Sequence, residues 1–237
     1  QADMDNKELI SNISHDLKTP ITAIKGYVEG IMDGVAASPE KLDKYIRTIY
    51  NKANDMDRLI DELTFYTKID TNKLPYNYEE VNIVDFFQDC AAEIGLDMEA
   101  AGIGFSFDSN IKKDTIIVAD VEQMKRAINN IIGNSVKYLN KIPGKIGIKL
   151  LDEGDFVRID ISDNGRGIDK KDLPCIFDRF YRADYSRNSS TGGSGIGLSI
   201  VKKIVEAHSG FIRAESDIGK GTDIIILLRK HQSSKKF

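Results

Sequence analysis

Hydrophobic residues recur at steps of three and four positions through the first seventy residues of the chain. This pattern is typical of helices that bury a narrow stripe of side chains against partners. Between two such series, Ser38 is placed to cap a second helix that begins at Pro39. The sequence therefore predicts an antiparallel helical hairpin. Its stripes consist of Ile10, Ile13, Leu17, Pro20, Ile24, Tyr27 and Ile31, then Leu42, Ile46, Ile49, Ala53, Met56, Ile60, Leu63 and Thr67.

A pair of helices buries little surface by itself, so we expect two copies of the hairpin to form a homodimeric four-helix bundle. The alternative is a hairpin that packs against the downstream part of the same chain. Residues 34–40 form the connection between the helices in either arrangement.

After a linker around Asn72–Asn77, helical and strand patterns alternate. Strand hairpins within this mixed order favour an α+β sandwich over a doubly wound parallel sheet. We expect helices at 83–101, 120–139 and 196–208, the last closed by Gly210, and strands at 103–108, 115–119, 145–151, 156–163, 211–215 and 222–228. The predicted organisation is a helical domain at 1–70, a linker at 71–80, a second domain at 81–231 and a tail at 232–237.

Composition narrows the class of protein. The 237 residues are 41% hydrophobic and 30% charged, which is typical of a soluble globular protein. The net charge of −4, with acids and bases interspersed, gives no footprint for nucleic acid. Cys90 and Cys175 form no metal-binding spacing and are expected to be reduced. No apolar run approaches the roughly 20 residues that span a bilayer, so we expect the cytoplasmic output portion of a longer protein, with any membrane segment upstream.

A candidate nucleophile lies on the first helix. Counting Ile10 as position a of a heptad places His15 at position f, farthest from the apolar stripe. Thr19 lies four residues later on the same face, and Pro20 predicts a kink or loosened backbone beside His15. Asp16 adds a carboxylate next to this imidazole.

Three downstream segments have the residue types of a nucleotide site. On the predicted helix 120–139, Asn130 and Asn134 are four residues apart and share a face with Lys137 and Tyr138. Asparagine oxygens suit Mg²⁺ whose charge is already matched by phosphates. The alternative is an ordinary polar helix surface.

The second segment is Asp163-Asn164-Gly165-Arg166-Gly167, which follows an apolar strand. Its glycines allow the backbone to turn tightly and to approach a flat ligand. A buried Asp163 carboxylate would accept a hydrogen bond from the exocyclic amine of adenine. The alternative is an ordinary Asn-Gly turn.

The third segment is the glycine-rich run 192–198, which precedes a predicted helix and would present backbone N–H groups to an anion. It lacks the Lys-Ser/Thr ending of a Walker loop. The polar residues 182–191 before it have the composition of a mobile lid. Phe177, Phe180 and Tyr181 beside that lid are better explained as hydrophobic anchors than as stacking partners of a base.

Five motifs follow one another in the order found in sensor histidine kinases of two-component systems, which this chain resembles over nearly its whole length. They are SHDLKTP at 14–20, NIIGNSVKY at 130–138, DNGRGI at 163–168, FDRFYR at 177–182 and GGSGIGLSIVK at 192–202. The resemblance implies a dimerisation and histidine-phosphotransfer hairpin followed by an ATP-binding domain of the Bergerat type, shared with gyrase-like ATPases.

The resemblance also implies roles for individual residues. His15 matches the phosphoacceptor, Asp16 the adjacent acid/base group and Thr19 the position used to dephosphorylate the partner regulator. Asn134 matches the Mg²⁺ ligand and Asp163 the carboxylate that reads adenine. The remaining positions implied in ATP binding are Asn130, Lys137, Tyr138, Gly165, Gly167, Ile168, Phe177, Arg182, Gly193, Ser194, Gly195, Ile196, Gly197, Leu198 and Thr222.

The function that follows is ATP-dependent phosphorylation of His15 and transfer of the phosphoryl group to an aspartate on a separate response regulator, with dephosphorylation of that regulator expected as a second activity. Three alternatives remain open: a module dominated by regulator dephosphorylation, a dimeric scaffold that no longer catalyses, and an ATP-driven machine of the gyrase type. Loss of His15, Asn134 or Asp163 would mark the scaffold, and all three residues are present.

Overall fold

The computed structural model describes residues 2–71, 74–182 and 195–231. The chain forms two compact units, one of residues 1–74 with 192–196 and one of residues 75–191 with 197–237.

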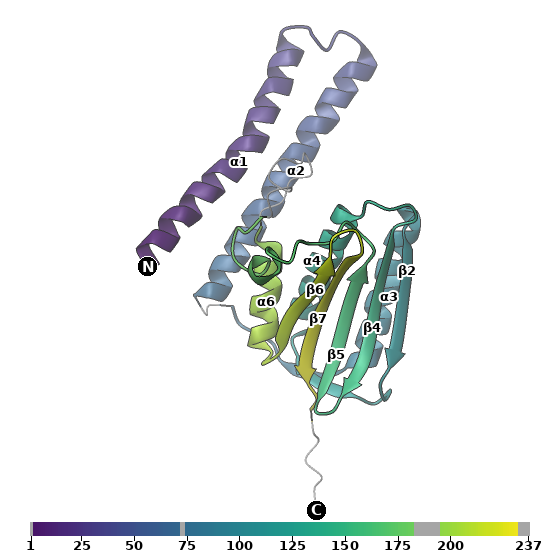
Figure 1. Ribbon diagram of the computed structural model, residues 1–237. Helices are drawn as coiled ribbons and strands as arrows, with labels where there is room; N and C mark the ends of the chain where they lie inside the picture. The colour runs from purple at the N-terminus through teal and green to yellow at the C-terminus, as the bar shows by residue number, and fades with distance from the viewer. Residues whose placement is uncertain (1, 72–73, 183–194, 232–237) are drawn as a thin grey trace, which may run out of the picture. The chain divides into compact units, whose positions relative to one another are not determined.

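The first unit contains the predicted helical hairpin, made of α1 (Ala2–Met32) and α2 (Pro39–Asp70) (Figure 1). The Ser38 hydroxyl accepts a hydrogen bond from the Lys41 N–H at 3.2 Å, which confirms the predicted cap and start of α2. Helix α1 contains Pro20 and continues past it to Met32. The Tyr27 and Tyr45 rings meet edge to face at 5.0 Å between the helices. In a single copy of the chain, apolar side chains of the hairpin, Leu42, Ile46 and Ile60 among them, remain exposed.

The second unit is built on a five-stranded sheet with the strand order β2-β4-β5-β7-β6. Strands β2 and β4 are parallel, and all the remaining neighbouring pairs are antiparallel. A separate two-stranded sheet pairs β1 with β3. This mixed arrangement confirms the α+β class. The strands are β1 (Glu79–Asn82), β2 (Gly104–Asn110), β3 (Ile116–Ala119), β4 (Lys145–Glu153), β5 (Phe156–Asp163), β6 (Phe211–Asp217) and β7 (Gly221–Arg229).

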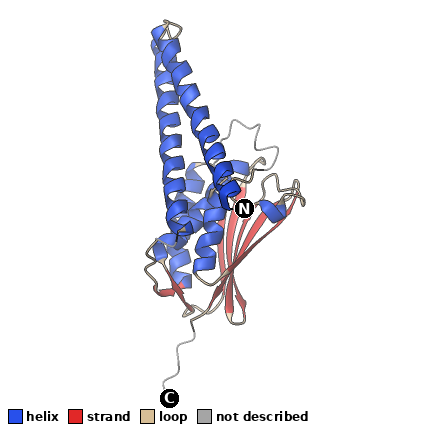
Figure 2. Ribbon diagram, turned by 90° about the vertical axis from the view of Figure 1, so that its left-hand side faces the viewer, coloured by secondary structure: helices blue, strands red, loops and turns tan. Residues whose placement is uncertain are grey.

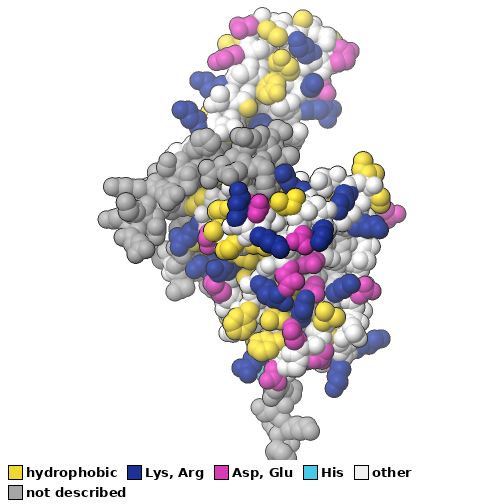
Figure 3. Space-filling model, viewed as in Figure 1, with side chains coloured by type: hydrophobic (Ala, Val, Ile, Leu, Met, Phe, Trp, Pro, Cys, Tyr) yellow, Lys and Arg dark blue, Asp and Glu magenta, His cyan; other side chains and the backbone are white. Residues whose placement is uncertain are grey.

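Helices cover one face of the five-stranded sheet (Figure 2). They are α3 (Ile83–Ala100), α4 (Val121–Tyr138) and α6 (Gly197–Ala207), and the short 3-10 helix η1 (Leu173–Cys175) lies in the connection after β5. Alternate residues of β5 point toward the helices, and the core between helices and sheet is mainly aliphatic, with Phe87 and Met124 also fully buried. The opposite face carries interspersed acidic and basic side chains (Figure 3), including the pair Arg158 and Asp160 at 2.7 Å.

Capping residues explain where the helices of this unit begin and end. Asp120 accepts a hydrogen bond from the Gln123 N–H at 3.0 Å and starts α4, as predicted. Helix α6 ends differently from the prediction. Ser209, rather than Gly210, takes the left-handed conformation, with φ 53°. The Gly210 N–H then bonds back to the Val205 carbonyl at 2.9 Å, as in the Schellman motif.

The first residues of the second unit are tied to the start of α4 and the end of α6. The Asn77 N–H donates to the Asp120 carboxylate at 2.8 Å, and the Tyr78 hydroxyl donates to the Ala207 carbonyl at 2.7 Å. The Tyr78 ring also meets His208 edge on, at 5.3 Å. Strand β1 begins directly afterwards, so Glu79 and the residue that follows it, which the sequence places in the linker, pair with β3.

Buried His208 connects these elements. The Asp120 N–H donates to His208 Nε2 at 2.9 Å, so the ring proton is on Nδ1, which donates to the Ile204 carbonyl at 2.7 Å. Burial lowers the pKa of His208 from its ordinary value near 6.5. The folded unit therefore contains a neutral imidazole whose two nitrogens are both hydrogen bonded.

Candidate nucleotide site

Helix α4 and the beginning of α6 bring two of the predicted motifs together. The Asn130 Nδ2 group donates to the carbonyl oxygen of Gly197, the first residue of α6, at 3.3 Å. Asn134, one turn further along α4, lies with its Nδ2 4.0 Å from the point where a Cβ on Gly197 would be. The paired amides are therefore next to a helix N-terminus, where the backbone dipole favours an anion.

A second contact links α4 to the end of β5. Asp163 is the last residue of β5, and its Oδ2 accepts a hydrogen bond from the Ser135 hydroxyl at 3.1 Å. Its Oδ1 accepts from the Gly165 N–H at 2.8 Å. Ser135 was not identified from the sequence. The available signal was a hydroxyl residue on the apolar face of α4, where Ile128, Ile131 and Ile132 are buried.

The Asp163 carboxyl lies in an environment that disfavours its charge. Burial raises its pKa, while the hydrogen bonds from Gly165 and Ser135 act in the opposite direction. A carboxylate offers about four acceptor directions, so a further N–H donor from a ligand can also bind it. Such a donor would replace part of the hydration that burial removes.

The glycines after Asp163 allow the loop to pack closely against its neighbours. A Cβ on Gly165 would lie 2.7 Å from the Tyr138 carbonyl oxygen at the end of α4. Gly167 has φ 74°, and a Cβ there would lie 2.1 Å from the Asp217 carbonyl oxygen in the β6–β7 hairpin. The sequence assigned these glycines to a close approach to ligand. In the structure they allow close approach to the protein backbone, and their contact with a ligand remains a prediction.

Several other predicted residues have contacts or burial that the structure describes. Lys137 Nζ lies 5.0 Å from the centre of the Tyr138 ring at the end of α4. The Thr222 hydroxyl, at the start of β7, lies 3.1 Å from that of Ser216. The Tyr181 hydroxyl donates to the buried Asp172 carboxylate at 2.6 Å, so this predicted anchor is held by a polar contact. Phe177 and Arg182 are half-buried, and Leu198 is the second residue of α6.

The remaining predicted residues lie on α1 or just before α6, and some of them are outside the described part of the chain. Gly193 and Ser194 lie outside the described residues, as do the side chains of His15 and Asp16, whose backbone is part of α1. Thr19, also on α1, is exposed. Gly195 has φ 67°, and it and Ile196 directly precede α6.

Two features are absent from the part of the chain that the structure describes. Among the described side chains, no group of three or more His, Cys, Asp or Glu residues is able to hold a metal ion. No helix among the same residues has the length and apolar character needed to cross a membrane.

Two family models match this chain. Residues 5–72 match the His Kinase A (phospho-acceptor) domain, and residues 119–232 match the histidine kinase-, DNA gyrase B- and HSP90-like ATPase. Together the two matches cover more than half of the chain. The sensor histidine kinase WalK of Bacillus subtilis strain 168 is 32% identical over 229 residues, which are 95% of this chain and 37% of WalK.

The chain belongs to the sensor histidine kinases of two-component systems. A second relative of this kinase is the sensor protein SrrB of Staphylococcus aureus strain MRSA252, which is 33% identical over 96% of the chain and 39% of SrrB. The kinase chain thus spans less than two fifths of the length of these curated relatives.

Solved histidine kinases share the fold. Acinetobacter baumannii histidine kinase AdeS aligns over 92% of this kinase chain and 98% of its own, with a TM-score of 0.72 and 22% identity. Histidine kinase ThkA, in complex with response regulator protein TrrA, aligns over 94% of this chain and 61% of its own, with a TM-score of 0.74 and 24% identity. The predicted hairpin and α/β sandwich are therefore confirmed as a histidine kinase fold.

Proposed function

We propose that this chain uses ATP to phosphorylate His15 and then passes the phosphoryl group to an aspartate of a response regulator. The observation that carries the proposal is the pair of contacts made by α4. Asn130 reaches Gly197, and Ser135 holds Asp163. One helix thereby joins the predicted phosphate-binding and base-binding segments. The relatives named as sensor kinases support the same activity.

The geometry supports a division of labour within the site. Asp163 accepts a hydrogen bond from the exocyclic amine of adenine. The loop that follows it is shaped by Gly165 and Gly167. Backbone N–H groups at the beginning of α6 bind phosphate oxygens. The remaining proposed contacts with ATP come from Tyr138, Ile168, Phe177, Arg182, Gly193, Ser194, Gly195, Ile196, Gly197, Leu198 and Thr222.

The Asn134 amide suits Mg²⁺, because a hard cation prefers oxygen ligands and the phosphates of ATP supply the negative charge. Asn130 and Lys137 lie beside the phosphates, where Lys137 neutralises part of their charge. When bound, Mg²⁺ supplies electrostatic stabilisation of the phosphoryl group. The described residues therefore fit Mg²⁺ bound jointly by one amide and the nucleotide.

The chemistry requires a neutral imidazole. A ring nitrogen of His15 attacks the γ-phosphorus, the N–P bond forms, and the bond to the leaving oxygen of ADP breaks. Asp16 accepts a hydrogen bond from the N–H of the other ring nitrogen, which fixes the tautomer, and its negative charge stabilises the positive charge that develops on the ring. Positioning and electrostatic stabilisation by Lys137 and the α6 N–H groups account for most of the rate enhancement in such transfers.

The hairpin supports the proposed partners. Apolar side chains exposed on the single hairpin, including Ile46 and Ile60, would be buried in a homodimeric four-helix bundle. Thr19 is exposed on α1, where it would take part in dephosphorylating the regulator. In this scheme residues 1–70 dimerise and carry His15, and the unit that contains residues 81–231 binds ATP on the cytoplasmic side.

A labelling experiment tests the proposal. The full chain is incubated with Mg²⁺ and γ-³²P-labelled ATP, and labelling of the wild type is compared with His15→Ala and a matched control, His231→Ala. We expect an acid-labile, base-stable label on the wild type and on His231→Ala, and none on His15→Ala. Equal labelling of all three proteins, or an acid-stable label, would contradict the proposal.

A further inference from the structure

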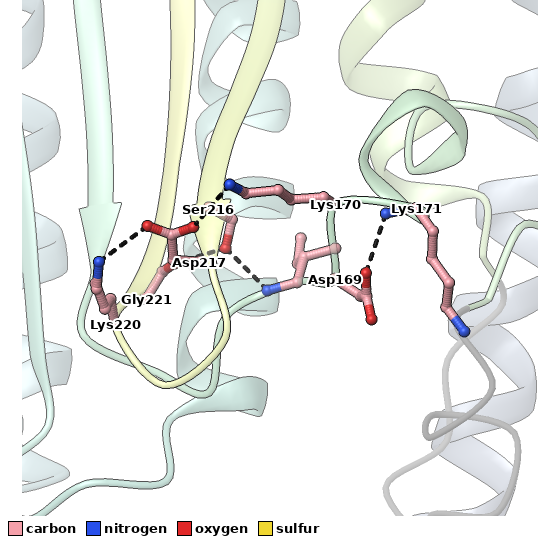
Figure 4. Close-up of polar contacts among 8 residues, drawn as sticks. Asp169, Lys170, Lys171, Ser216, Asp217, Lys220 and Gly221 are labelled. Atoms are coloured by element: carbon pink, nitrogen blue, oxygen red, sulfur yellow. Dashed lines mark hydrogen bonds and ion pairs between the residues drawn. The ribbon is translucent and has the colours of Figure 1, made fainter.

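One hydroxyl group in the second unit connects three chain segments. Ser216, near the end of β6, accepts a hydrogen bond from the Ile168 N–H at 2.8 Å (Figure 4). Its own proton is donated to the Gly221 carbonyl at 2.6 Å. The Thr222 hydroxyl lies 3.1 Å away. Ser216 thus joins the loop that follows Asp163 to the β6–β7 turn (residues 217–221) and to the start of β7.

The same two segments also interlock through their backbones. The Gly219 N–H donates to the Arg166 carbonyl at 2.7 Å. A Cβ on Gly167 would lie 2.1 Å from the Asp217 carbonyl oxygen, and a Cβ on Gly221 would lie 1.9 Å from the Asp163 carbonyl oxygen. The packing leaves no room for a methyl group at either glycine, so the backbones of the loop and the turn lie directly against each other.

This interlock reaches the base-binding carboxylate directly. Thr222 is the β7 partner of Asp163 in the β5–β7 register. On the other side of the loop, the Arg166 N–H donates to the Tyr138 carbonyl at 3.2 Å. The loop is therefore held between the end of α4 and the β6–β7 turn, and Ser216 provides the side-chain hydrogen bonds on the turn side.

One ion pair, Lys170–Asp217, also bridges the loop and the turn, and a second, Lys220–Asp217, lies within the turn, but solvent weakens both. Asp217 lies 3.1 Å from Lys220 and 3.7 Å from Lys170, as drawn in Figure 4. The side chains of Lys170 and Lys220 are 83% and 78% exposed, and ion pairs this exposed contribute little to stability. Ser216 is partly buried, and loss of its hydroxyl would leave two backbone groups without their partner.

We propose that Ser216 is a positioning residue for adenine recognition. Its hydroxyl holds the Ile168 backbone and with it the loop that fixes Asp163. The inference rests on the proposed function, because it assumes that Asp163 accepts a hydrogen bond from the amine of adenine. Ser216 does not touch the nucleotide in this scheme and acts through the loop alone.

The test compares binding of ATP with binding of purine riboside triphosphate, which lacks the exocyclic amine, by calorimetry on the full chain. Ser216→Ala should bind ATP about tenfold more weakly while binding the amine-free analogue nearly as well as the wild type does. Ser216→Thr retains a hydroxyl and should restore ATP affinity. Ser216→Cys keeps the size with a weak hydrogen-bonding group, and provides the comparison if the alanine variant does not fold.

A matched control removes a similar bond elsewhere. The buried Thr115 hydroxyl donates to the Lys112 carbonyl at 2.6 Å beside β3, so Thr115→Val loses one such bond and should leave both affinities unchanged. Ser216 variants with unchanged preference for ATP, or an equal loss of preference in Thr115→Val, would overturn the inference.

Amide hydrogen exchange separates this inference from the proposed function. The Ile168 N–H should exchange about tenfold faster in Ser216→Ala than in the wild type, and Ser216→Thr should protect it again. A wild type that binds no ATP would refute the proposed function. An unchanged exchange rate of the Ile168 N–H in Ser216→Ala would instead show that Ser216 does not position the loop.

Discussion

Gly167 packs against the β6–β7 turn, and this contact predicts how much an alanine at Gly167 would destabilise the fold. Gly219, within that turn, provides the control. Gly167 and Gly219 have nearly the same positive φ, 74° and 79°. A Cβ on Gly219 would meet nothing within 4 Å, whereas a Cβ on Gly167 would lie 2.1 Å from the Asp217 carbonyl oxygen. Comparison of the two alanine variants therefore isolates the steric overlap.

The expected magnitudes follow from this difference. Alanine at either site adopts a left-handed conformation, which costs about 1 to 2 kcal/mol of unfolding free energy. At Gly167 the turn must also move by about 1 Å, which breaks the Gly219–Arg166 and Ser216–Ile168 hydrogen bonds. Each broken bond costs about 1 kcal/mol. Gly167→Ala should therefore lose about 3 to 4 kcal/mol, and Gly219→Ala about 1 to 2 kcal/mol.

The measurement must report on the sheet unit rather than on the helical hairpin. Urea unfolding of the full chain, with pulsed hydrogen exchange read on peptides from β5 and β7, satisfies this condition. Unfolding free energies of the two variants that agree within about 0.5 kcal/mol would refute the reasoning, because the overlap would then have been relieved without loss of the hydrogen bonds.

Three further predictions concern Asp163, His208 and Asn134. Burial raises the pKa of Asp163, so its folded-state pKa exceeds the unfolded value and the ionised form destabilises the fold at neutral pH. Asp163→Asn should raise the urea midpoint at pH 7 yet abolish ATP binding, and a lowered midpoint would contradict this. Burial lowers the pKa of His208, so stability should be full above pH 6.5 and fall as the pH drops from there toward the folded-state value. His208→Gln should flatten that part of the urea-midpoint profile, and an unchanged slope would exclude His208 as its cause. Asn134→Ala should abolish Mg²⁺-dependent labelling, whereas Asn129→Ala, on the exposed side of α4, should label normally; labelling of both would remove Asn134 from metal binding.

Local side-chain chemistry explains which elements could be predicted from the sequence. Ser38 and Asp120 were recognisable as helix caps because the hydrogen bonds they accept come from residues three positions later. Asn130 and Asn134 could be placed on one helix face because residues four positions apart in a helix lie one above the other. Strand β1 was missed, since Glu79–Asn82 is short and polar and is defined by pairing with β3, more than thirty residues away.

Long-range packing decides what could not be predicted. The Ser135–Asp163 hydrogen bond depends on how α4 crosses β5, which no local pattern encodes. Ser209 takes a left-handed conformation that favours glycine, so the composition pointed to its neighbour Gly210 instead. The glycines of the loop were associated with close approach to a ligand, which remains a prediction; the surfaces that the structure places against them, Tyr138 and Asp217, come from distant segments.

The hydrogen bonds of Asn77 and Tyr78 have a mechanical consequence. They attach the entry to the ATP-binding unit to Asp120 and Ala207, which lie at the far ends of the two helices that carry Asn130 and Gly197. Helix α6 has 11 residues, so Ala207 is about 15 Å from Gly197 along its axis. A force applied to residues 77 and 78 would thus act on both helices together. It would reach the helices that carry Asn130 and Gly197 without any contact with the nucleotide.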